Sequence, residues 1–306
     1  MRVVFIGASK FGLRCLDLTR GLRGCEVVGV VTAPQTFSIS YRPQGVTNVL
    51  YADVAGYAAA NSLPYVVMVG GMNDPPLFRT VAAWRPDCFL VAGWYHMVPK
   101  AWRALAPAYG LHASLLPDYC GGAPLVWAII NGEERAGISL FRLAEGVDDG
   151  PLYGQAEEPI RDNDTIATLY ARIEEHGLGL LRDILPKIAS GAVEPKEQDA
   201  SRRRVFPQRS PEDGRIDWAL PARGVFNFVR AQTRPYPGAF ALFEGEKVHV
   251  WRARLAGEDG AGFRVVCGDG RALELEEIGY QGGTMSGAEF LSRIGKEQAH
   301  EARFLG

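Results

Sequence analysis

The feature that most constrains this chain is the alternation of short β-branched runs with helical patterns over residues 3–195. The expected strands are short and apolar, and lie at residues 3–6, 25–32, 65–68, 88–92 and 110–113. The helices expected between them lie at residues 11–22, 53–60, 76–83 and 124–130. Strands that alternate with helices pack as a parallel sheet with crossover helices. We therefore predict an α/β domain.

The rest of this region contains longer patterns. Residues 138–143 and 153–160 are apolar and strand-like, and we expect the two segments to pair. Residues 165–189 have the apolar spacing of a long amphipathic helix. Residues 33–45 show neither pattern and are expected to form a polar loop.

The character of the chain changes after residue 195. Residues 196–204 are charged and poor in apolar side chains, which is typical of a linker. One predicted helix at residues 222–232 is then followed by short strand patterns between Gly-rich turns, which suggests a small β-barrel-like domain. We predict three parts: a first domain (residues 1–195), a linker (196–204) and a second domain (205–306).

Composition excludes several classes of protein. The formal net charge is -2, which does not favour nucleic acid or an anionic membrane as a partner of the whole chain. No stretch approaches the roughly 18 apolar residues that cross a bilayer. The five cysteines are scattered without metal-ligand spacing. We expect a cytoplasmic protein without a metal.

His112 is the first candidate functional residue. It lies at the end of a predicted strand and opens into a Pro- and Gly-rich loop at residues 114–124. Open α/β sheets bind ligands at the carboxyl ends of their strands. On strand periodicity, His112 and Ser114 share a face. A lone histidine is more often structural, so this position alone leaves both interpretations open.

An acidic turn at residues 145–150 provides the second candidate, Asp148. Asp-Gly pairs are most common in solvated hairpin turns, which gives this segment a structural interpretation. The functional interpretation is that the carboxylate of Asp148 reaches the same edge of the sheet as His112.

These segments resemble a known family, the N10-formyltetrahydrofolate-dependent formyltransferases, which act on methionyl-tRNA, glycinamide ribonucleotide or amino sugars. The segments that carry the resemblance in the first domain are residues 93–100, 112–117, 121–124 and 146–150. Those that resemble the second domain of the enzymes acting on tRNA and on amino-arabinose are residues 211–218, 229–231 and 235–239. The resemblance implies a Rossmann-like formyltransferase domain followed by a smaller, OB-type β-barrel domain.

The resemblance also implies a mechanism. N10-formyltetrahydrofolate would be a cosubstrate, His112 the base that takes a proton from the attacking amine, and Asp148 its partner. The chemistry of the residues agrees, because an imidazole is the side chain best suited to take and release protons near neutrality. A carboxylate bonded to the ring would fix its tautomer and stabilise the cation that forms.

Further residues are expected to contact the two substrates. Those assigned to the folate are Gly93, Trp94, Tyr95, Met97, Leu115, Leu116, Pro117 and Val147. Those assigned to the amine are Ser114, Tyr119, Gly121 and Gly122. The glycines would permit close approach of the backbone.

One position departs from the family. Two residues before the histidine, the family usually has an asparagine that donates to the tetrahedral oxyanion, whereas this chain has Gly110. Loss of one such donor typically lowers kcat by about 10²–10³. Backbone N–H groups, Ser114 or a reorganised loop are the open substitutes. Two alternatives follow from this departure: a folate-binding protein without transferase activity, and a hydrolase of formyl-folate.

The choice of amine rests on charge. Enzymes acting on tRNA are expected to present basic surface, but residues 33–45 contain Arg42 as their only cation. Residues 205–306 contain 13 Lys or Arg against 14 Asp or Glu. Because phosphate contacts dominate affinity for nucleic acid, a nucleotide-linked amino sugar is favoured over methionyl-tRNA. The run at residues 202–204, three arginines, has two interpretations, a phosphate contact and a solvated linker, of which the linker is favoured. The oligomeric state is left open, a homodimer included.

Overall fold

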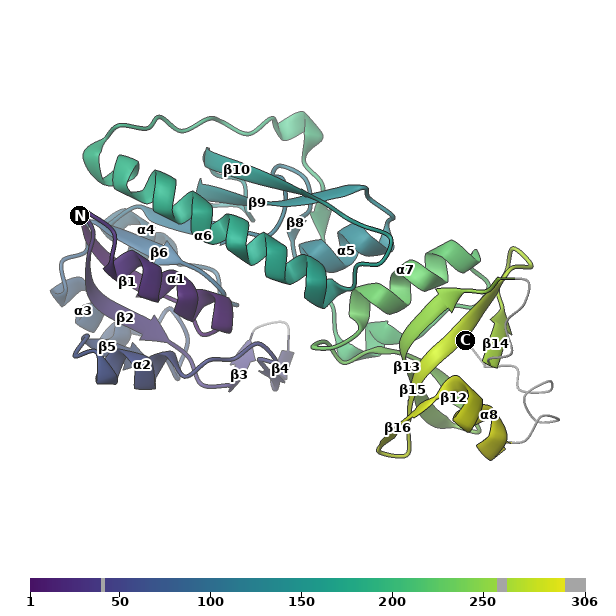
Figure 1. Ribbon diagram of the computed structural model, residues 1–306. Helices are drawn as coiled ribbons and strands as arrows, with labels where there is room; N and C mark the ends of the chain where they lie inside the picture. Colours follow the sequence, from purple (N-terminus) through teal and green to yellow (C-terminus); the bar gives the residue numbers. More distant parts are fainter. Residues whose placement is uncertain (40–41, 258–262, 295–306) are drawn as a thin grey trace. The chain divides into compact units, whose positions relative to one another are not determined.

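The computed structural model describes residues 1–39, 42–257 and 263–294 (Figure 1). The chain divides into two compact units. The first unit contains residues 1–121, 137–158 and 172–205, and the second contains residues 122–136, 159–171 and those from 206 onward. This division places two segments of the predicted first domain in the second unit. One of them carries α5 (Pro124–Ile130), which packs against α7 (Ala222–Gln232).

A seven-stranded sheet forms the centre of the first unit, in the order β10-β9-β7-β6-β1-β2-β5. Its strands are β1 (Arg2–Ile6), β2 (Glu26–Thr32), β5 (Tyr65–Val67), β6 (Cys88–Val91), β7 (Ala108–His112), β9 (Arg135–Arg142) and β10 (Leu152–Pro159). The strands from β7 to β5 run parallel, and β9 is antiparallel to β7. The predicted parallel α/β domain and the pairing of the last two strands are therefore confirmed.

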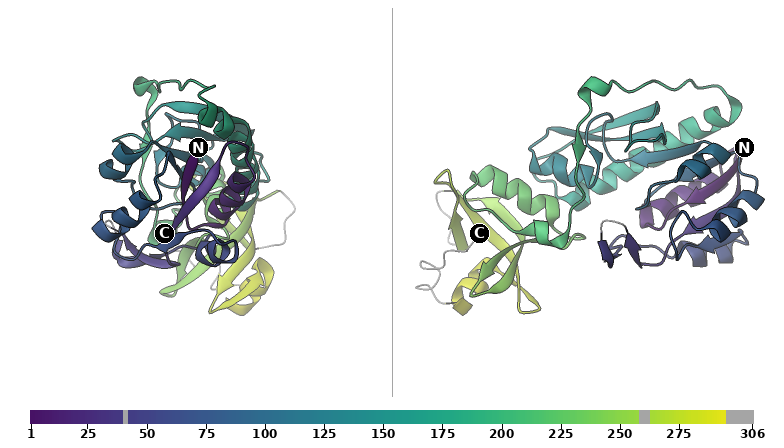
Figure 2. Two further views of the ribbon diagram at one scale, coloured as in Figure 1. Left: turned by 90° about the vertical axis from the view of Figure 1, so that its left-hand side faces the viewer. Right: turned by 180° about the vertical axis from the view of Figure 1, so that it is seen from behind.

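Helices cover both faces of this sheet (Figure 2). They are α1 (Lys10–Arg20), α2 (Val54–Ala60), α3 (Pro75–Ala83), α4 (Lys100–Leu105) and α6 (Ile166–Ser190). Alternate residues of β1 enter two different cores: Val4 and Ile6 pack with one set of helices, and Val3 and Phe5 with the other. A strand buried on both faces is a continuous apolar run, which is why the sequence pattern identified it.

The segment at residues 33–45 was expected to be a polar loop, and this prediction is wrong. It contains two antiparallel strands, β3 (Thr36–Ile39) and β4 (Arg42–Thr47), in which Phe37 pairs with Val46. β3 alternates polar and apolar residues over only four positions, and β4 contains Pro43 and Gly45, which are typical of loops, so the strand pattern is too short and interrupted to be recognised. Part of the segment, residues 40–41 and the side chain of Arg42, lies outside the described residues.

Residues 196–204, expected to be a linker, are in contact with the first unit. Lys196 exchanges two backbone hydrogen bonds of 2.8 Å with Leu152, the first residue of β10. Further along, the backbone N–H of Arg204 donates to the carbonyl of Pro117 at 3.3 Å. Between these points lies a short 3-10 helix, η1 (Ala200–Arg202). This segment therefore lies along the first unit from β10 to the loop after His112.

The second unit is built on an antiparallel sheet, which confirms the predicted strand-rich second domain. Its strands run in the order β12-β13-β15-β14, with β16 beside β15. The strands are β12 (Ala239–Phe243), β13 (Glu246–Leu255), β14 (Phe263–Val266), β15 (Ala272–Tyr280) and β16 (Gly283–Ser286). The remaining elements of the chain are α8 (Gly287–Ile294), η2 (Pro211–Gly214) and the short strands β8 (Cys120–Gly121) and β11 (Val205–Phe206).

The longest helix, α6, has 25 residues and is amphipathic. Leu181 and Leu185 are fully buried, whereas Arg182 and Asp183 between them are exposed. No helix in the described part of the chain combines the length and apolar character that a membrane span needs.

Glu158 ties α6 to β10 and provides a test of the packing. This carboxylate is 8% exposed and accepts hydrogen bonds from Arg172 Nε at 2.5 Å and His176 Nε2 at 2.8 Å. Burial acts to raise the pKa of Glu158, but the hydrogen bonds from His176 and Arg172 outweigh it and lower that pKa.

We expect Glu158→Gln to lower the free energy of unfolding by about 1–3 kcal/mol at neutral pH, because charged hydrogen bonds are lost. A lowered pKa contributes stability above the unfolded value of about 4.3, and this contribution is lost as pH falls through the folded value. The difference in free energy of unfolding between the unchanged protein and the variant is measured by urea unfolding. It should therefore be constant near pH 7 and should disappear below about pH 4. The control Glu157→Gln removes an exposed charge one residue away. An equal effect of both variants would contradict the assignment.

Candidate active site

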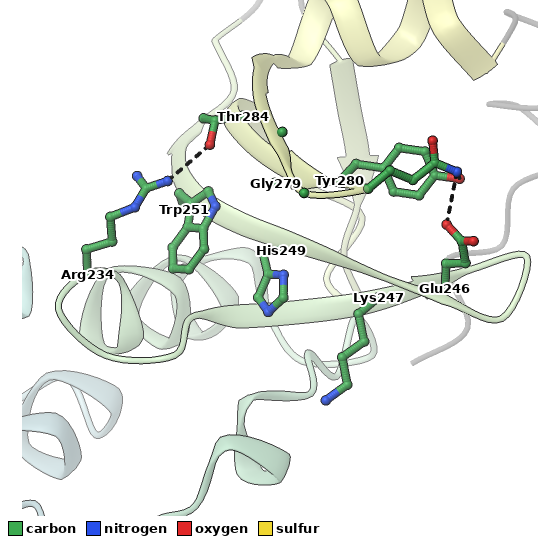
Figure 3. Close-up of a pocket in the computed structure, with 11 residues that line it drawn as sticks. Arg234, Glu246, Lys247, His249, Trp251, Gly279, Tyr280 and Thr284 are labelled. Carbon is green, nitrogen blue, oxygen red and sulfur yellow. Dashed lines mark hydrogen bonds between the residues drawn. The ribbon is translucent and has the colours of Figure 1, made fainter. Parts of the chain in front are cut away.

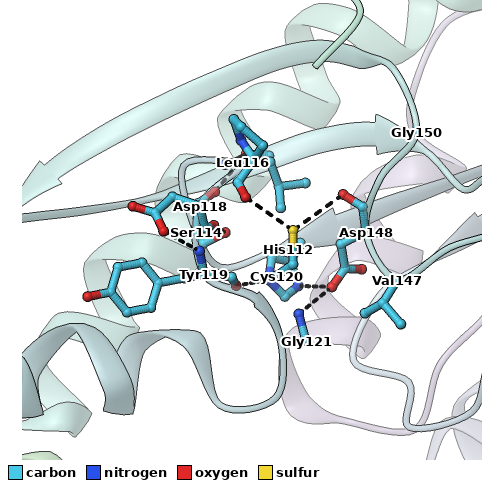
Figure 4. Close-up of polar contacts among 12 residues, drawn as sticks. His112, Ser114, Leu116, Asp118, Tyr119, Cys120, Gly121, Val147, Asp148 and Gly150 are labelled. Atoms are coloured by element: carbon cyan, nitrogen blue, oxygen red, sulfur yellow. Dashed lines mark hydrogen bonds and ion pairs between the residues drawn. The ribbon is translucent and has the colours of Figure 1, made fainter. Parts of the chain in front are cut away.

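His112 is the last residue of β7, and Asp148 lies in the connection between β9 and β10 (Figure 4). Nδ1 of His112 is 3.5 Å from Oδ2 of Asp148, and the side chains are 12% and 21% exposed. The structure thus brings together the two residues that the sequence singled out. A separation of 3.5 Å is longer than an ideal hydrogen bond, and such contacts in unliganded enzymes commonly shorten when substrate binds.

The turn that carries Asp148 has a constrained backbone. Asp148 has φ +54°, in the left-handed region that aspartate tolerates better than most residues. A Cβ on Gly150 would lie 1.8 Å from the carbonyl oxygen of Arg142, so only glycine fits there. The second contact of Oδ2 of Asp148 is the backbone N–H of Gly121, at 2.8 Å. The carboxylate therefore joins the imidazole to the loop that follows it.

The other ring nitrogen of His112 faces the same loop. Nε2 lies 2.8 Å from the carbonyl oxygen of Tyr119, which itself has φ +53°. Because a carbonyl oxygen only accepts, Nε2 carries the hydrogen in this arrangement. For His112 to take a proton from an amine, Nε2 must exchange the Tyr119 carbonyl for the amine nitrogen.

Cys120 is close to these residues but is not suited to be a nucleophile. Its thiol contacts the carbonyl of Pro117 at 3.3 Å. Burial, with a further effect of the Asp148 charge, raises the pKa of Cys120 to about 11. Since the thiolate is the reactive form, this side chain is inert near neutrality.

Several of the expected substitutes for the missing asparagine are already paired. The hydroxyl of Ser114 is buried and donates to the carbonyl of Asp118 at 2.7 Å. The backbone N–H groups of residues 119–122 are paired: Tyr119 with Asp118 Oδ1, Cys120 with Arg204 O, Gly121 with Asp148 Oδ2 and Gly122 with Phe206 O. A reorganised loop, or a backbone N–H outside this set, stays open as the substitute.

The space at Gly110 is filled by neighbouring side chains. A Cβ at this position would lie 2.7 Å from Cδ1 of Leu143 and 3.2 Å from Cε1 of Phe141. An asparagine here therefore requires that Leu143, a flexible side chain, move away.

The predicted folate segment after β6 begins with a required glycine. Gly93 has φ +60°, and a Cβ there would lie 1.8 Å from Oγ of Ser9. Tyr95 donates its hydroxyl hydrogen to Oδ1 of Asn48 at 3.1 Å, and the side chain of Met97 is 58% exposed. Trp94 is half-buried and packs against one of the two cores of the sheet.

Sequence reasoning missed His96 in this segment. Its ring lies 5.4 Å from that of Trp94 and 5.1 Å from that of Phe37. Burial lowers the pKa of His96, so the neutral form is favoured near pH 7. Within the described residues, Trp94 Nε1 and His96 Nε2 are buried atoms without a hydrogen-bond partner. A histidine in an aromatic cluster has no spacing that sequence analysis could use.

The remaining predicted folate contacts differ in exposure. Leu116 and Pro117 are buried, and Leu116 packs with Cys120, Phe141 and Leu152 in a small cluster. Leu115 is half-buried, and the side chain of Val147 is 38% exposed. Leu116 and Pro117 thus support the loop, whereas Val147 is accessible to a ligand. Gly122, a predicted amine contact, belongs to the second unit, where Gln208 fills the space of a Cβ.

A cavity of about 490 Å³ lies in the second unit, beside β13, β15 and β16 (Figure 3). It contains none of the predicted site residues. The indole of Trp251 lies between the guanidinium of Arg234, 4.2 Å away, and the ring of His249, stacked at 5.2 Å. The protein's own side chains therefore cover both faces of this ring.

The described ranges contain no group of three or more His, Cys, Asp or Glu side chains placed to hold a metal ion.

Comparisons with known proteins identify both parts of the chain. The family model described as formyl transferase matches residues 1–185, and the model of the formyl transferase C-terminal domain matches residues 209–295. A methionyl-tRNA formyltransferase of Chloroflexus aurantiacus is 32% identical over 293 residues, covering 91% of this chain and 92% of that protein.

Solved structures share the fold at lower identity. An N-formyltransferase from Helicobacter canadensis, in complex with folinic acid and dTDP-3-aminofucose, has 16% identity and a TM-score of 0.65, covering 89% of this chain and 98% of its own. HypX from Aquifex aeolicus, in complex with tetrahydrofolic acid, has 18% identity and a TM-score of 0.62, with 96% of this chain covered. This chain spans only about half the length of HypX, 47%.

Proposed function

The chain belongs to the formyl transferase family, and on this premise we propose that it formylates the primary amine of a small molecule, with His112 as base and Asp148 as its partner. The formyl group comes from N10-formyltetrahydrofolate. The observation that carries the proposal is the contact of the His112 imidazole with the Asp148 carboxylate at the carboxyl end of β7. Ligands bind at this edge in open α/β sheets.

The proposed reaction moves one formyl group and balances its protons. The amine nitrogen attacks the formyl carbon, the bond from that carbon to N10 breaks, and the products are a formamide and tetrahydrofolate. The amine loses one proton and N10 gains one. Once the Tyr119 carbonyl has left Nε2, the neutral imidazole must adopt the tautomer with its hydrogen on Nδ1, where Asp148 accepts it. The bare Nε2 then takes the proton of the amine, and Asp148 stabilises the resulting imidazolium. Proton transfer by a positioned side chain typically contributes about 10²–10⁴ in rate.

Charge pairing supports a small amine over tRNA. In the arginine run at residues 202–204, Arg203 donates to the carbonyl of Val147, and Arg204 pairs with the carboxylate of Asp118. Three arginines of the second unit are paired with glutamates of β15: Arg234 with Glu277, Arg252 with Glu276, and Arg254 with Glu274. Four of these five arginines are paired with a carboxylate, which weakens the net positive potential that they present. Phosphate contacts dominate affinity for nucleic acid, so this pairing makes tRNA the less favoured acceptor.

Methionyl-tRNA is the second candidate acceptor. The observation that favours it is the 32% identity, over most of the chain, to a methionyl-tRNA formyltransferase. A folate-binding protein or a formyl-folate hydrolase is the third, because Gly110 cannot supply the donor of the family's asparagine.

An acceptor screen separates these functions. The purified protein is incubated with N10-formyltetrahydrofolate and, in turn, dTDP-linked 3-amino and 4-amino sugars, methionyl-tRNA, or no amine. Mass spectrometry detects the formamide, and a coupled assay detects formate. We expect a formylated amino sugar, no formylmethionyl-tRNA, and little formate without an amine. Formylation of the tRNA alone would reverse the choice of acceptor, and rapid formate release without an amine would identify a hydrolase. Folate binding without turnover would identify a binding protein.

A further inference from the structure

The turn that carries Asp148 is held by side chains from residues 196–204, here called the strap. The side-chain amide of Gln198 donates to two carbonyl oxygens of the turn, those of Asp148 at 2.8 Å and Gly150 at 2.6 Å. Nη2 of Arg203 donates to a third, that of Val147, at 2.7 Å. The turn is thus fixed by donors that come from about fifty residues further along the chain.

The same strap also holds the loop that faces His112. Arg204 pairs through its guanidinium with the carboxylate of Asp118 and accepts at its carbonyl from Cys120 N at 2.9 Å. Both groups that contact the imidazole, the carboxylate of Asp148 and the carbonyl of Tyr119, therefore lie on segments bound to the strap.

Asp148 needs this support because of its backbone. A non-glycine residue in the left-handed region persists only where its surroundings determine the conformation. The direction of its carboxylate towards His112 and Gly121 follows from that backbone. A primary amide provides two hydrogens on one nitrogen, and both acceptors of Gln198 lie within hydrogen-bond distance of that nitrogen.

The orientation of the Gln198 amide is determined by these contacts. Its Oε1 is buried and has no hydrogen-bond partner within the described residues. A flipped amide would place Oε1 against the two carbonyl oxygens, which only accept. The side chain is therefore used solely as a donor, and a buried unpaired oxygen is a cost that the site tolerates.

We propose that Gln198 is a positioning residue for Asp148. Gln198 holds the turn so that the carboxylate meets the imidazole of His112. Arg203 contributes a weaker contact of the same kind, since its bond to Val147 is exposed. The inference rests on the proposed roles of His112 and Asp148.

The test uses Gln198→Met, which keeps the length of the side chain and removes both donors. With N10-formyltetrahydrofolate and the acceptor from the screen that has the highest turnover, kcat should fall by about 10- to 100-fold, as for other misplaced groups. KM for the folate should stay within about threefold, because both hydrogens of the Gln198 amide are used by the turn. In an Asp148→Asn background, Gln198→Met should change kcat by less than about threefold, since it acts through Asp148. Additive losses would instead indicate a structural role.

Two adjacent arginines provide the matched control. Arg203→Ala and Arg202→Ala remove the same charge from exposed positions of the strap, but only Arg203 donates to the turn in the described structure. Arg203→Ala should lower kcat severalfold, and Arg202→Ala should leave it within about twofold. Equal effects of both would overturn the role of the strap.

A second measurement does not depend on the acceptor. The backbone N–H of Gly121 donates to Asp148, so its hydrogen exchange, followed by NMR, reports whether the carboxylate is in place. Gln198→Met should speed this exchange relative to Arg202→Ala. Two results would contradict the role of Gln198 and leave the proposed function intact. One is an unchanged exchange rate of the Gly121 N–H in Gln198→Met. The other is an unchanged kcat of Gln198→Met while His112→Ala and Asp148→Asn are inactive. Full activity of those two variants would overturn the proposed function instead.

Discussion

Replacement of His112 by alanine is expected to lower kcat for formyl transfer by about 10²–10⁴-fold, the contribution of a positioned base. The variant loses the only imidazole in contact with Asp148 in the described part of the chain. The Asp148 carboxylate keeps the N–H of Gly121 as a partner, so the turn should survive the substitution. Steady-state kinetics with the formyl donor and the best acceptor from the screen measure the loss.

Two controls make this result specific to chemistry. Thermal unfolding should show a folded variant, and titration calorimetry with a formyl-folate analogue should give a Kd close to that of the unchanged protein. His112→Gln, which can still donate to the Tyr119 carbonyl, should be as inactive as the alanine variant. Activity near the original level in both variants would show that the imidazole is not the base.

Asp148→Asn is expected to have the second-largest effect, a loss of about 10²–10⁴ in kcat, similar to that seen when a histidine loses its carboxylate partner elsewhere. The amide has the shape of the carboxylate, and its oxygen can still accept from Gly121. It has no charge to stabilise the imidazolium. Gly121 and His112 contact the same oxygen, so an amide that turned its NH2 group to this side would remove the acceptor from both.

The neighbouring Asp149 provides the control for this substitution. Asp149→Asn removes the same charge from an exposed side chain of the same turn and should change kcat by less than about twofold. The two variants are compared at one pH and one ionic strength. Equal losses would mean that the charge of the turn, rather than the contact with His112, supports the reaction.

The elements predicted most accurately have strong local patterns. Both α5 and α7 were predicted residue for residue, because each combines a proline at or before its first turn with helical apolar spacing. The strand β1 was identified because it is buried on both faces. The helix α4 was missed, since six residues are too few to show a period. The strands β3 and β4 were missed because β3 has only four residues and β4 contains Pro43 and Gly45, which are typical of loops.

The candidate site shows a similar division. His112 was selected because it ends a predicted strand, and Asp148 because it lies in a glycine-bracketed acidic turn; the structure places them 3.5 Å apart. Because β9 runs antiparallel to β7, it is the connection after β9, and not the end of that strand, that carries Asp148 to His112. The contacts of Tyr119 and Gln198 use backbone carbonyl oxygens, which every residue has. Such contacts leave no signature in residue type or spacing, so only the folded chain reveals them.

The same reasoning explains why the strap was taken for a linker. Its charged, apolar-poor composition is that of a solvated segment, and Arg203 and Arg204 were weighed as part of a solvated linker or as phosphate contacts. In the fold, their hydrogen bonds go to Val147 and Asp118. The role of a charged side chain depends on which acceptors the fold brings near it. These arginines and their acceptors are 56 and 86 residues apart in the sequence, too far for a local sequence pattern to reveal the contact.

A structure of the protein with bound folinic acid tests the central claim most directly. The account predicts that N10 of the ligand, the atom that carries the formyl group in the donor, lies beside His112, with Nε2 released from the Tyr119 carbonyl and Asp148 within hydrogen-bond distance of Nδ1. An N10 atom bound away from His112, or an imidazole still bonded to Tyr119 and shielded from the ligand, would contradict it.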